Sequence, residues 1–336
     1  MKKQLAATAY AFLLCTSTVV EVPAAKATIQ IPKIVCSTVN PDTATASGPR
    51  IQHITVDGNP VSVLLPPQYG TSMRKYPVLY LLYGAESDVD SFLIRTNLIT
   101  VTSAFPDNQQ FIVVTPSGGL TGFYVDWKDG SHNYETEIIN RVIPAIDARF
   151  RTLADKGHRA VAGVSMGGFG AAHYGVKHPD LFGAIGTLSG GDNNQASDEA
   201  VVIIGATVEQ RECADGLAAG QYDPFGMFGD PVLDAGRWRA ANPVANASQL
   251  RGMDIYLTAG NGSPCDADDA QTLVTNPGEG VLELGVGQTT LDLHVALRFA
   301  GVQHIYDAKP CGIHTYKYFT PEVTTYVNRL ARLFSS

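Results

Sequence analysis

The sequence predicts a single α/β domain with a mostly parallel central sheet and helices on both of its faces. Near-continuous apolar runs recur along the chain and alternate with segments whose apolar residues have helical spacing. Such runs are typical of strands buried on both faces, and their alternation with helices indicates βαβ units. The chain has 336 residues, of which 45% are hydrophobic and 17% charged, so it can bury a large core.

The expected elements follow one another along the chain. Segments 51–56 and 61–66 flank a turn-forming Asp-Gly-Asn-Pro at 57–60 and predict paired strands. Helices are expected over 134–150 and, as an amphipathic closing helix, over 321–334. The other strands are expected within 76–84, 111–119, 159–165, 183–190, 254–262 and 303–308.

The longest interval without an expected strand runs from Asp192 to about Leu250. It is too long for a simple loop, so we interpret about 192–250 as an inserted cap over one end of the sheet. No repeat or linker divides the remaining sequence, and the segment 28–336 is expected to form one domain.

Residues 1–27 predict a secretory signal peptide that is cleaved. Two lysines precede a mostly apolar stretch at 5–20, and the small residues around 25–27 form a cleavage site. An N-terminal membrane anchor is the alternative, but the stretch is short for a span and three hydroxyl residues at 16–18 interrupt it. The mature protein is therefore expected to be secreted or associated with the cell envelope.

The charge of the mature chain limits its partners. Removing residues 1–27 takes away three Lys and one Glu, which moves the formal net charge from −8 to −10. A chain this acidic, with no clustered Lys and Arg face, is poorly suited to bind nucleic acid or anionic lipid. We therefore expect neutral partners, no nucleic acid and no stable membrane span.

Four cysteines remain after the signal peptide. An even number in an exported protein predicts two disulfides. Cys265 and Cys311 each follow an expected strand and should meet at one edge of the sheet, which leaves Cys36 to pair with Cys213. Pairing of Cys265 with Cys213 is the alternative. No His or Cys spacing indicates a metal site, and no cofactor is expected.

The pentapeptide GVSMG at 163–167 fits the pattern Gly-x-Ser-x-Gly. An apolar run precedes it and a helix-capable segment follows. A serine on such a strand-to-helix turn has strained backbone angles, and small neighbours let the turn close and a carbonyl group approach. The alternative is a tight turn whose serine only caps the helix. With the strand and helix in place, the motif predicts Ser165 as a catalytic nucleophile.

A serine hydroxyl needs a base to act as a nucleophile. In this type of fold the nucleophile comes first along the chain, the acid second and the base last. His314 is the histidine that occupies the loop between the last expected strand and the last helix, so it is the predicted base. The other later histidines lie in or beside expected helices and strands: His173, His178, His294 and His304.

The residues alone leave the orienting acid open. Asp266, Asp268 and Asp269 follow the expected strand at 254–262, whereas Glu283 opens the next helical segment. An oxyanion site is expected from two backbone N–H groups, one of Met166 and one of Ala85 in the loop after 76–84.

An ordered series of segments resembles the antigen 85 mycolyltransferases and their esterase relatives in the α/β-hydrolase superfamily. The resemblance covers most of the mature chain and includes the predicted nucleophile turn. The similar segments are YPVLYLLYGAES at 76–87, TGFYVDWKDG at 121–130, NYETEIINRVIPAIDARF at 133–150, AGVSMGG at 162–168, GMFGDPVLDAGRWRAANP at 226–243, IYLTAGNGSP at 255–264 and GIHTYKYF at 312–319.

The resemblance implies an α/β-hydrolase fold and acyl transfer through an acyl-serine. In that family the acid is a glutamate in a Leu-Glu pair on the helix between the last two strands. Leu282 and Glu283 match this pair, 31 residues before His314, so the resemblance favours Glu283 over Asp266.

The resemblance also implies substrate contacts. Asp126 and Trp127 fall where the family lines the approach to the site, although a buried Trp with a capping Asp is an equal alternative. Tyr83 and Tyr316 replace residues of the family's trehalose site, and Glu86 replaces an arginine.

These features predict a secreted serine acyltransferase or esterase acting on an acyl ester or glycolipid. The replaced sugar-binding residues favour a carboxylesterase that uses water, whereas the ordered resemblance favours a mycolyltransferase-like enzyme. A non-catalytic surface-binding protein on a hydrolase fold is the alternative from another class.

Overall fold

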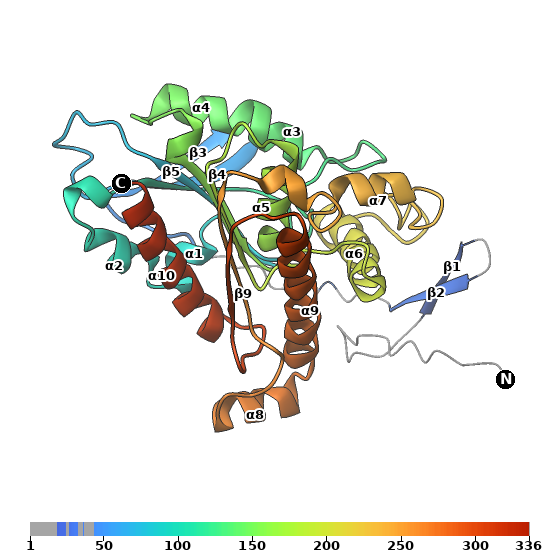
Figure 1. Ribbon diagram of the computed structural model, residues 1–336. Helices are drawn as coiled ribbons and strands as arrows, with labels where there is room; N and C mark the ends of the chain where they lie inside the picture. Colours follow the sequence, from blue (N-terminus) through green and yellow to red (C-terminus); the bar gives the residue numbers. More distant parts are fainter. Residues whose placement is uncertain (1–18, 25–26, 33–35, 37–43, 336) are drawn as a thin grey trace.

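The computed structural model describes residues 19–24, 27–32, 36 and 44–335. Its strands are β1 (Val19–Ala24), β2 (Ala27–Pro32), β3 (Ile51–Val56), β4 (Asn59–Leu64), β5 (Val78–Leu82), β6 (Ile112–Pro116), β7 (Arg159–Val164), β8 (Ala184–Leu188), β9 (Asp254–Ala259) and β10 (Ile305–Ala308). The last eight form one sheet in the order β10-β9-β8-β7-β5-β6-β4-β3 (Figure 1). Strands β5 to β10 all run parallel to one another, whereas β4 pairs antiparallel with both β3 and β6.

The described helices alternate with the parallel strands. They are α1 (Ser91–Arg95), α2 (Leu98–Ser103), α3 (Tyr134–Glu137), α4 (Ile143–Arg149), α5 (Met166–Lys177), α6 (Ser197–Glu209), α7 (Ala235–Ala241), α8 (Ala267–Thr275), α9 (Gly278–Phe299) and α10 (Tyr316–Leu333). The π-helical stretches η3 (Ile138–Val142) and η5 (Gln210–Ala214) join α3 to α4 and extend α6.

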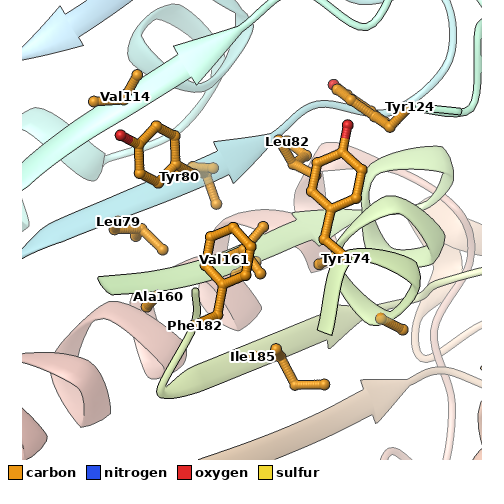
Figure 2. Close-up of a cluster of buried hydrophobic side chains, with 14 of the residues drawn as sticks. Leu79, Tyr80, Leu82, Val114, Tyr124, Ala160, Val161, Tyr174, Phe182 and Ile185 are labelled. Atoms are coloured by element: carbon orange, nitrogen blue, oxygen red, sulfur yellow. The ribbon is translucent and has the colours of Figure 1, made fainter. Parts of the chain in front are cut away.

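The sheet has helices on both faces, as the sequence predicts. Strands β5, β6, β7 and β8 are buried along their whole length. Successive residues of a strand point to opposite faces. On β8, Ile185 faces Gly175 of α5, whereas Gly186 faces Tyr326 of α10, so these two helices cover opposite faces. Figure 2 shows Tyr80, Tyr174 and Phe182 gathered over β5, β7 and β8 on the α5 side.

The closing helix begins earlier than expected. Its amphipathic pattern was expected to start at Pro321. The structure instead starts α10 at Tyr316, after Thr315 in an extended conformation, and holds Pro321 inside the helix. The first turn of α10 therefore follows directly on His314.

The interval expected as a cap contains α6, η5 and α7. The hydroxyl group of Thr121, in the loop after β6, donates to Ala206 O of α6 at 2.7 Å. The backbone N–H of Thr121 donates to Gln210 Oε1 of η5 at 3.0 Å. Helix α6 and η5 thus contact the loop that follows β6. The division into one domain with a cap at 192–250 stays a prediction.

Both predicted disulfides are present, and the alternative pairing of Cys265 with Cys213 is wrong. Cys36 is bonded to Cys213 of η5, and Cys265 is bonded to Cys311. The second bond joins the loop after β9 to the loop that carries His314.

Most of the predicted signal peptide lies outside the described residues, namely 1–18 and 25–26. Strand β1 covers 19–24 and pairs antiparallel with β2. Cleavage after residue 27 stays a prediction. None of the helices in the described ranges is long and apolar enough to cross a membrane.

Candidate active site

Ser165 lies on a sharp turn between β7 and α5. Its backbone has φ 56° and ψ −122°, which non-glycine residues rarely adopt. A Cβ atom on Gly163 would lie 2.3 Å from the backbone of Gly167, and one on Gly167 would lie 2.0 Å from Leu82 O. The two glycines therefore let the turn pack directly against β5, and the Ser165 side chain stays partly exposed at the strand end.

Gly167→Ala is expected to lower the free energy of unfolding by about 3 kcal/mol or more, because backbone atoms must move to admit the methyl group. Gly205→Ala is the matched control, since a Cβ there has no atom within 4 Å inside α6. That control should be neutral or stabilise the protein by up to about 1 kcal/mol. Urea denaturation measures both changes, and equal stabilities would contradict this account of the turn.

His314 connects Ser165 to Glu283. Its Nε2 accepts a hydrogen bond from Ser165 Oγ at 2.8 Å, and its Nδ1 donates to Glu283 Oε2 at 2.6 Å. The backbone N–H of His314 donates to Glu279 O in the first turn of α9 at 3.0 Å, which holds the loop in place. The structure thus brings together the predicted nucleophile, base and acid from three separate elements.

Glu283 is 1% exposed, and donors surround its carboxylate. Besides His314, Gly260 N donates to Oε1 at 2.6 Å and Ser189 Oγ donates to Oε1 at 2.8 Å. Both carboxylate oxygens of Glu283 therefore accept hydrogen bonds. Nearby Glu322 of α10 is also buried, and burial together with the charge of Glu283 raises the pKa of Glu322 well above its usual range.

Ser189 and Gly260 were not among the site residues expected from the sequence. Each directly follows a strand, β8 and β9, and Ser189 has φ 48°. A serine or glycine directly after an expected strand is the sequence signal that could have identified them.

The aspartates that follow β9 do not contact His314. Asp266 is exposed, caps α8 by accepting from Asp269 N at 3.0 Å, and accepts from Lys317 Nζ at 2.6 Å. Asp269 accepts from Cys265 N and Lys317 Nζ. Of the candidates that the residues left open, the structure places Glu283 beside the imidazole.

The predicted oxyanion donors flank Ser165. Met166 is the first residue of α5, so its N–H is one of the donors without a partner inside the helix. The loop after β5 passes close to the serine, since a Cβ on Gly84 would lie 3.3 Å from Ser165 Cβ. Ala85 follows in this loop and is exposed. Its role, and that of Met166, stay predictions.

Tyr83 has contacts inside the protein, and its predicted substrate contact stays a prediction. It is 2% exposed. Its hydroxyl accepts from Gly118 N at 2.9 Å and donates to Gly119 O at 3.1 Å. This network fixes the loop after β6 against β5, so burial explains why the side chain does not reach the surface of the site.

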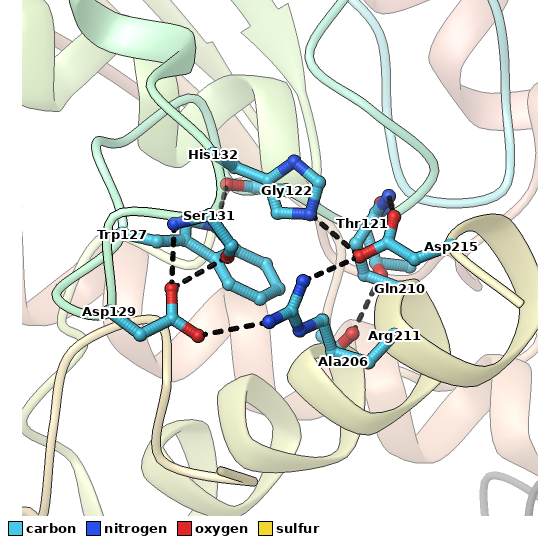
Figure 3. Close-up of polar contacts among 10 residues, drawn as sticks. All are labelled: Thr121, Gly122, Trp127, Asp129, Ser131, His132, Ala206, Gln210, Arg211 and Asp215. Atoms are coloured by element: carbon cyan, nitrogen blue, oxygen red, sulfur yellow. Dashed lines mark hydrogen bonds and ion pairs between the residues drawn. The ribbon is translucent and has the colours of Figure 1, made fainter. Parts of the chain in front are cut away.

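Trp127 is likewise buried, at 3% exposed, and its predicted place at the approach to the site stays a prediction. Its Nε1 donates to Gly122 O at 3.2 Å, and its ring packs edge-on against His132. His132 and Arg211 both bind Asp215, which ties this segment to η5 (Figure 3). These contacts favour the structural role that the sequence left as the alternative.

Asp126 accepts from Thr136 N at 2.9 Å and also lines a pocket of about 280 Å³ with His173, Lys177 and Arg237. Ser165 and His314 do not line this pocket.

Tyr316 lies closer to the triad, because its ring packs on Phe319, which contacts the His314 ring at 4.8 Å between centroids. Substrate binding by Asp126 and Tyr316 stays a prediction. In the part of the chain that the structure describes, no three or more His, Cys, Asp or Glu side chains could hold a metal ion.

Comparison with known proteins shows which protein family the sequence matches. The Esterase family model, described as "Putative esterase", matches residues 56–330. An esterase of Mycobacterium tuberculosis is 37% identical over 217 residues, which cover 63% of this chain and 45% of the relative. The chain thus matches less than half the length of that relative.

A more distant relative matches over a larger share of both chains. The diacylglycerol acyltransferase/mycolyltransferase Ag85B of Mycobacterium leprae is 27% identical over 286 residues, 80% of each chain. Among solved structures, Mycobacterium tuberculosis MPT51 has a TM-score of 0.65 and 21% identity, over 86% of this chain and 100% of that one. This structural likeness shows the α/β-hydrolase fold.

Proposed function

Since the chain belongs to the esterase family whose model spans residues 56–330, we propose that it is a secreted serine esterase or acyltransferase. In this proposal Ser165 is the nucleophile, His314 the base and Glu283 the orienting acid. The observation that carries it is the continuous hydrogen-bond chain from Ser165 Oγ through both nitrogens of His314 to Glu283. A non-catalytic binding protein has no need for this arrangement.

The reaction proceeds in two steps. As Ser165 Oγ attacks the ester carbonyl carbon, His314 Nε2 takes the hydroxyl proton, and Glu283 stabilises the imidazolium. The N–H groups of Met166 and Ala85 donate to the oxyanion of the tetrahedral intermediate. His314 then protonates the leaving alcohol, which breaks the ester bond and leaves an acyl-serine.

In the second step water or an alcohol attacks the acyl-serine. His314 takes a proton from the attacking hydroxyl group and returns it to Ser165 Oγ as the acyl group leaves. Water yields the free acid, and an alcohol yields a new ester. No cofactor takes part in this scheme.

Water is the favoured acceptor. Tyr83 replaces one of the family's trehalose-binding residues, and its hydroxyl is hydrogen-bonded to backbone groups of the loop after β6. A site without polar groups aimed at sugar hydroxyls loses several kcal/mol of discrimination. Acyl transfer to an alcohol is the second candidate, favoured by the similarity to Ag85B over 80% of both chains.

The acceptor can be tested with p-nitrophenyl butyrate and increasing trehalose. We expect hydrolysis to dominate and acyl-trehalose to account for less than about a tenth of the product, because the sugar hydroxyls lack partners. Mass analysis of the products gives the ratio. Transfer that dominates at low trehalose concentration would show that the family's acceptor is used despite the replaced residues.

Export is part of the proposal. Disulfides persist mainly in oxidising compartments, and this chain has two. The signal-like features of residues 1–27 agree with an extracellular or envelope location.

A further inference from the structure

Two carboxyl groups meet beside the predicted oxyanion loop. Glu86 directly follows Ala85, has φ 57°, and donates its backbone N–H to Leu120 O at 2.9 Å. Its side chain lies within hydrogen-bonding range of that of Glu209, the last residue of α6. Two carboxylates have no proton to donate, so this contact requires that the pair retains one proton.

The surroundings favour the retained proton. Glu209 Oε1 is buried and has no hydrogen-bond partner among the residues that the structure describes. Burial and the neighbouring Glu86 raise the pKa of Glu209 to about 8, and burial raises the pKa of Glu86. Glu279 of α9 faces both Glu86 and His314, so it adds a further acidic group beside the pair.

The pair completes a ring of contacts around the oxyanion loop. The loop after β5 is bonded to the loop after β6 through Glu86 N and Leu120 O. The next residue, Thr121, is bonded to Ala206 and Gln210 of α6 and η5 (Figure 3). Glu209 lies between Ala206 and Gln210 in the sequence, and its side chain contacts Glu86. Helix α6 is therefore attached to both loops at the carboxyl end of the sheet.

We propose that Glu86 and Glu209 are positioning residues, whose shared hydrogen bond holds the Ala85 N–H where it can donate to the oxyanion. This inference rests on the proposed function. It gives α6 an indirect part in the reaction, because Glu209 acts through the loop that carries Ala85.

The sign of the pH effect follows from the retained proton. At neutral pH the two side chains attract each other through one proton. Once that proton is lost, above about pH 8, two adjacent negative charges repel each other and the loop moves away from α6. The oxyanion donor then shifts, which lowers kcat more than it raises KM, because the donor acts mainly in the transition state.

Glu209→Gln separates this role from a purely structural one. The amide donates a hydrogen bond to Glu86 at every pH. Wild-type kcat for p-nitrophenyl butyrate should fall about tenfold between pH 7 and 9.5, whereas Glu209→Gln should lose this alkaline fall. Glu209→Ala, which has no donor, should have about a tenth of the wild-type kcat at pH 7 with KM within about twofold.

Glu199→Gln is the matched control. Glu199 is a second buried carboxyl group of α6 whose pKa is raised to about 8, but it faces Asp192 and Asp198. This variant should keep the wild-type pH profile. The rate at which a fluorophosphonate labels Ser165 provides a second readout that does not depend on the choice of ester.

The outcomes separate the two proposals. If wild-type Ser165 is labelled normally but Glu209→Gln keeps the full alkaline fall, the role of the pair is wrong and the triad stands. If Glu199→Gln removes the fall as well, a general charge effect explains the fall and the role of the pair is wrong. If wild-type Ser165 is not labelled at neutral pH, both proposals are wrong.

Discussion

Ser165→Ala is expected to lower kcat for ester hydrolysis by about 10⁶-fold, to the limit of detection. The substitution removes the oxygen that His314 Nε2 faces at 2.8 Å, and with it the acyl-enzyme. The fold should be unaffected, because the Ser165 side chain makes no capping hydrogen bond to α5 and alanine keeps the Cβ that the turn already admits. Thermal unfolding and steady-state hydrolysis measure the two effects separately.

The control is Ser131→Ala. Ser131 is an exposed serine that donates to Asp129, and its loss should change neither hydrolysis nor labelling by a fluorophosphonate. Labelling should occur in this variant and in the wild type, and should be absent in Ser165→Ala. Activity that persists in Ser165→Ala, or a label found on another residue, would refute the proposed nucleophile.

Glu283→Gln is expected to reduce kcat by about 10⁴-fold with little change in KM. The carboxylate accepts from His314, Gly260 and Ser189. An amide has one oxygen, so its NH₂ group must face at least one of these donors. The imidazole then loses the partner that fixes its tautomer and stabilises its positive charge.

Asp266→Asn is the matched control for the acid. Asp266 is exposed, and asparagine is an equally good N-cap residue for α8. We expect activity within about twofold of the wild type, since no contact links this side chain to His314. A crippled Asp266→Asn together with a nearly silent Glu283→Gln would show that the acid comes from the loop after β9.

Local pattern was sufficient for the strands and for the turn at Ser165. The apolar runs that predicted β5 to β9 are continuous because those strands are buried on both faces, a property that each run carries by itself. The glycines around Ser165 signal a backbone geometry fixed within five residues. Chain order then led to His314, because the loop after the last strand ends at the same edge of the sheet.

Long-range packing decided what local pattern left open. Glu283 reaches His314 from α9, and its donors come from the ends of β8 and β9, so spacing alone did not distinguish it from Asp266. The resemblance supplied that choice. It also placed Tyr83 and Trp127 near a substrate, but their burial depends on partners that no motif near them reveals.

The contact between Glu86 and Glu209 could not be predicted from the sequence, because it also depends on long-range packing. More than a hundred residues separate the two side chains. Only the packing of α6 against the loops after β5 and β6 brings them together, and the sequence predicted that interval without its helix positions.

The two disulfides close two separate covalent loops, residues 36–213 and residues 265–311. The bond from Cys36 to Cys213 encloses Ser165, and the bond from Cys265 to Cys311 encloses Glu283, with His314 three residues beyond. The segment 214–264 belongs to neither loop. A single cut at the exposed residues 218–221 would therefore leave the nucleophile on one polypeptide and its two partners on another, with the parallel pairing of β8 and β9 at their interface. A protein cut there, with both disulfides intact, should therefore hydrolyse esters only while β8 and β9 stay paired.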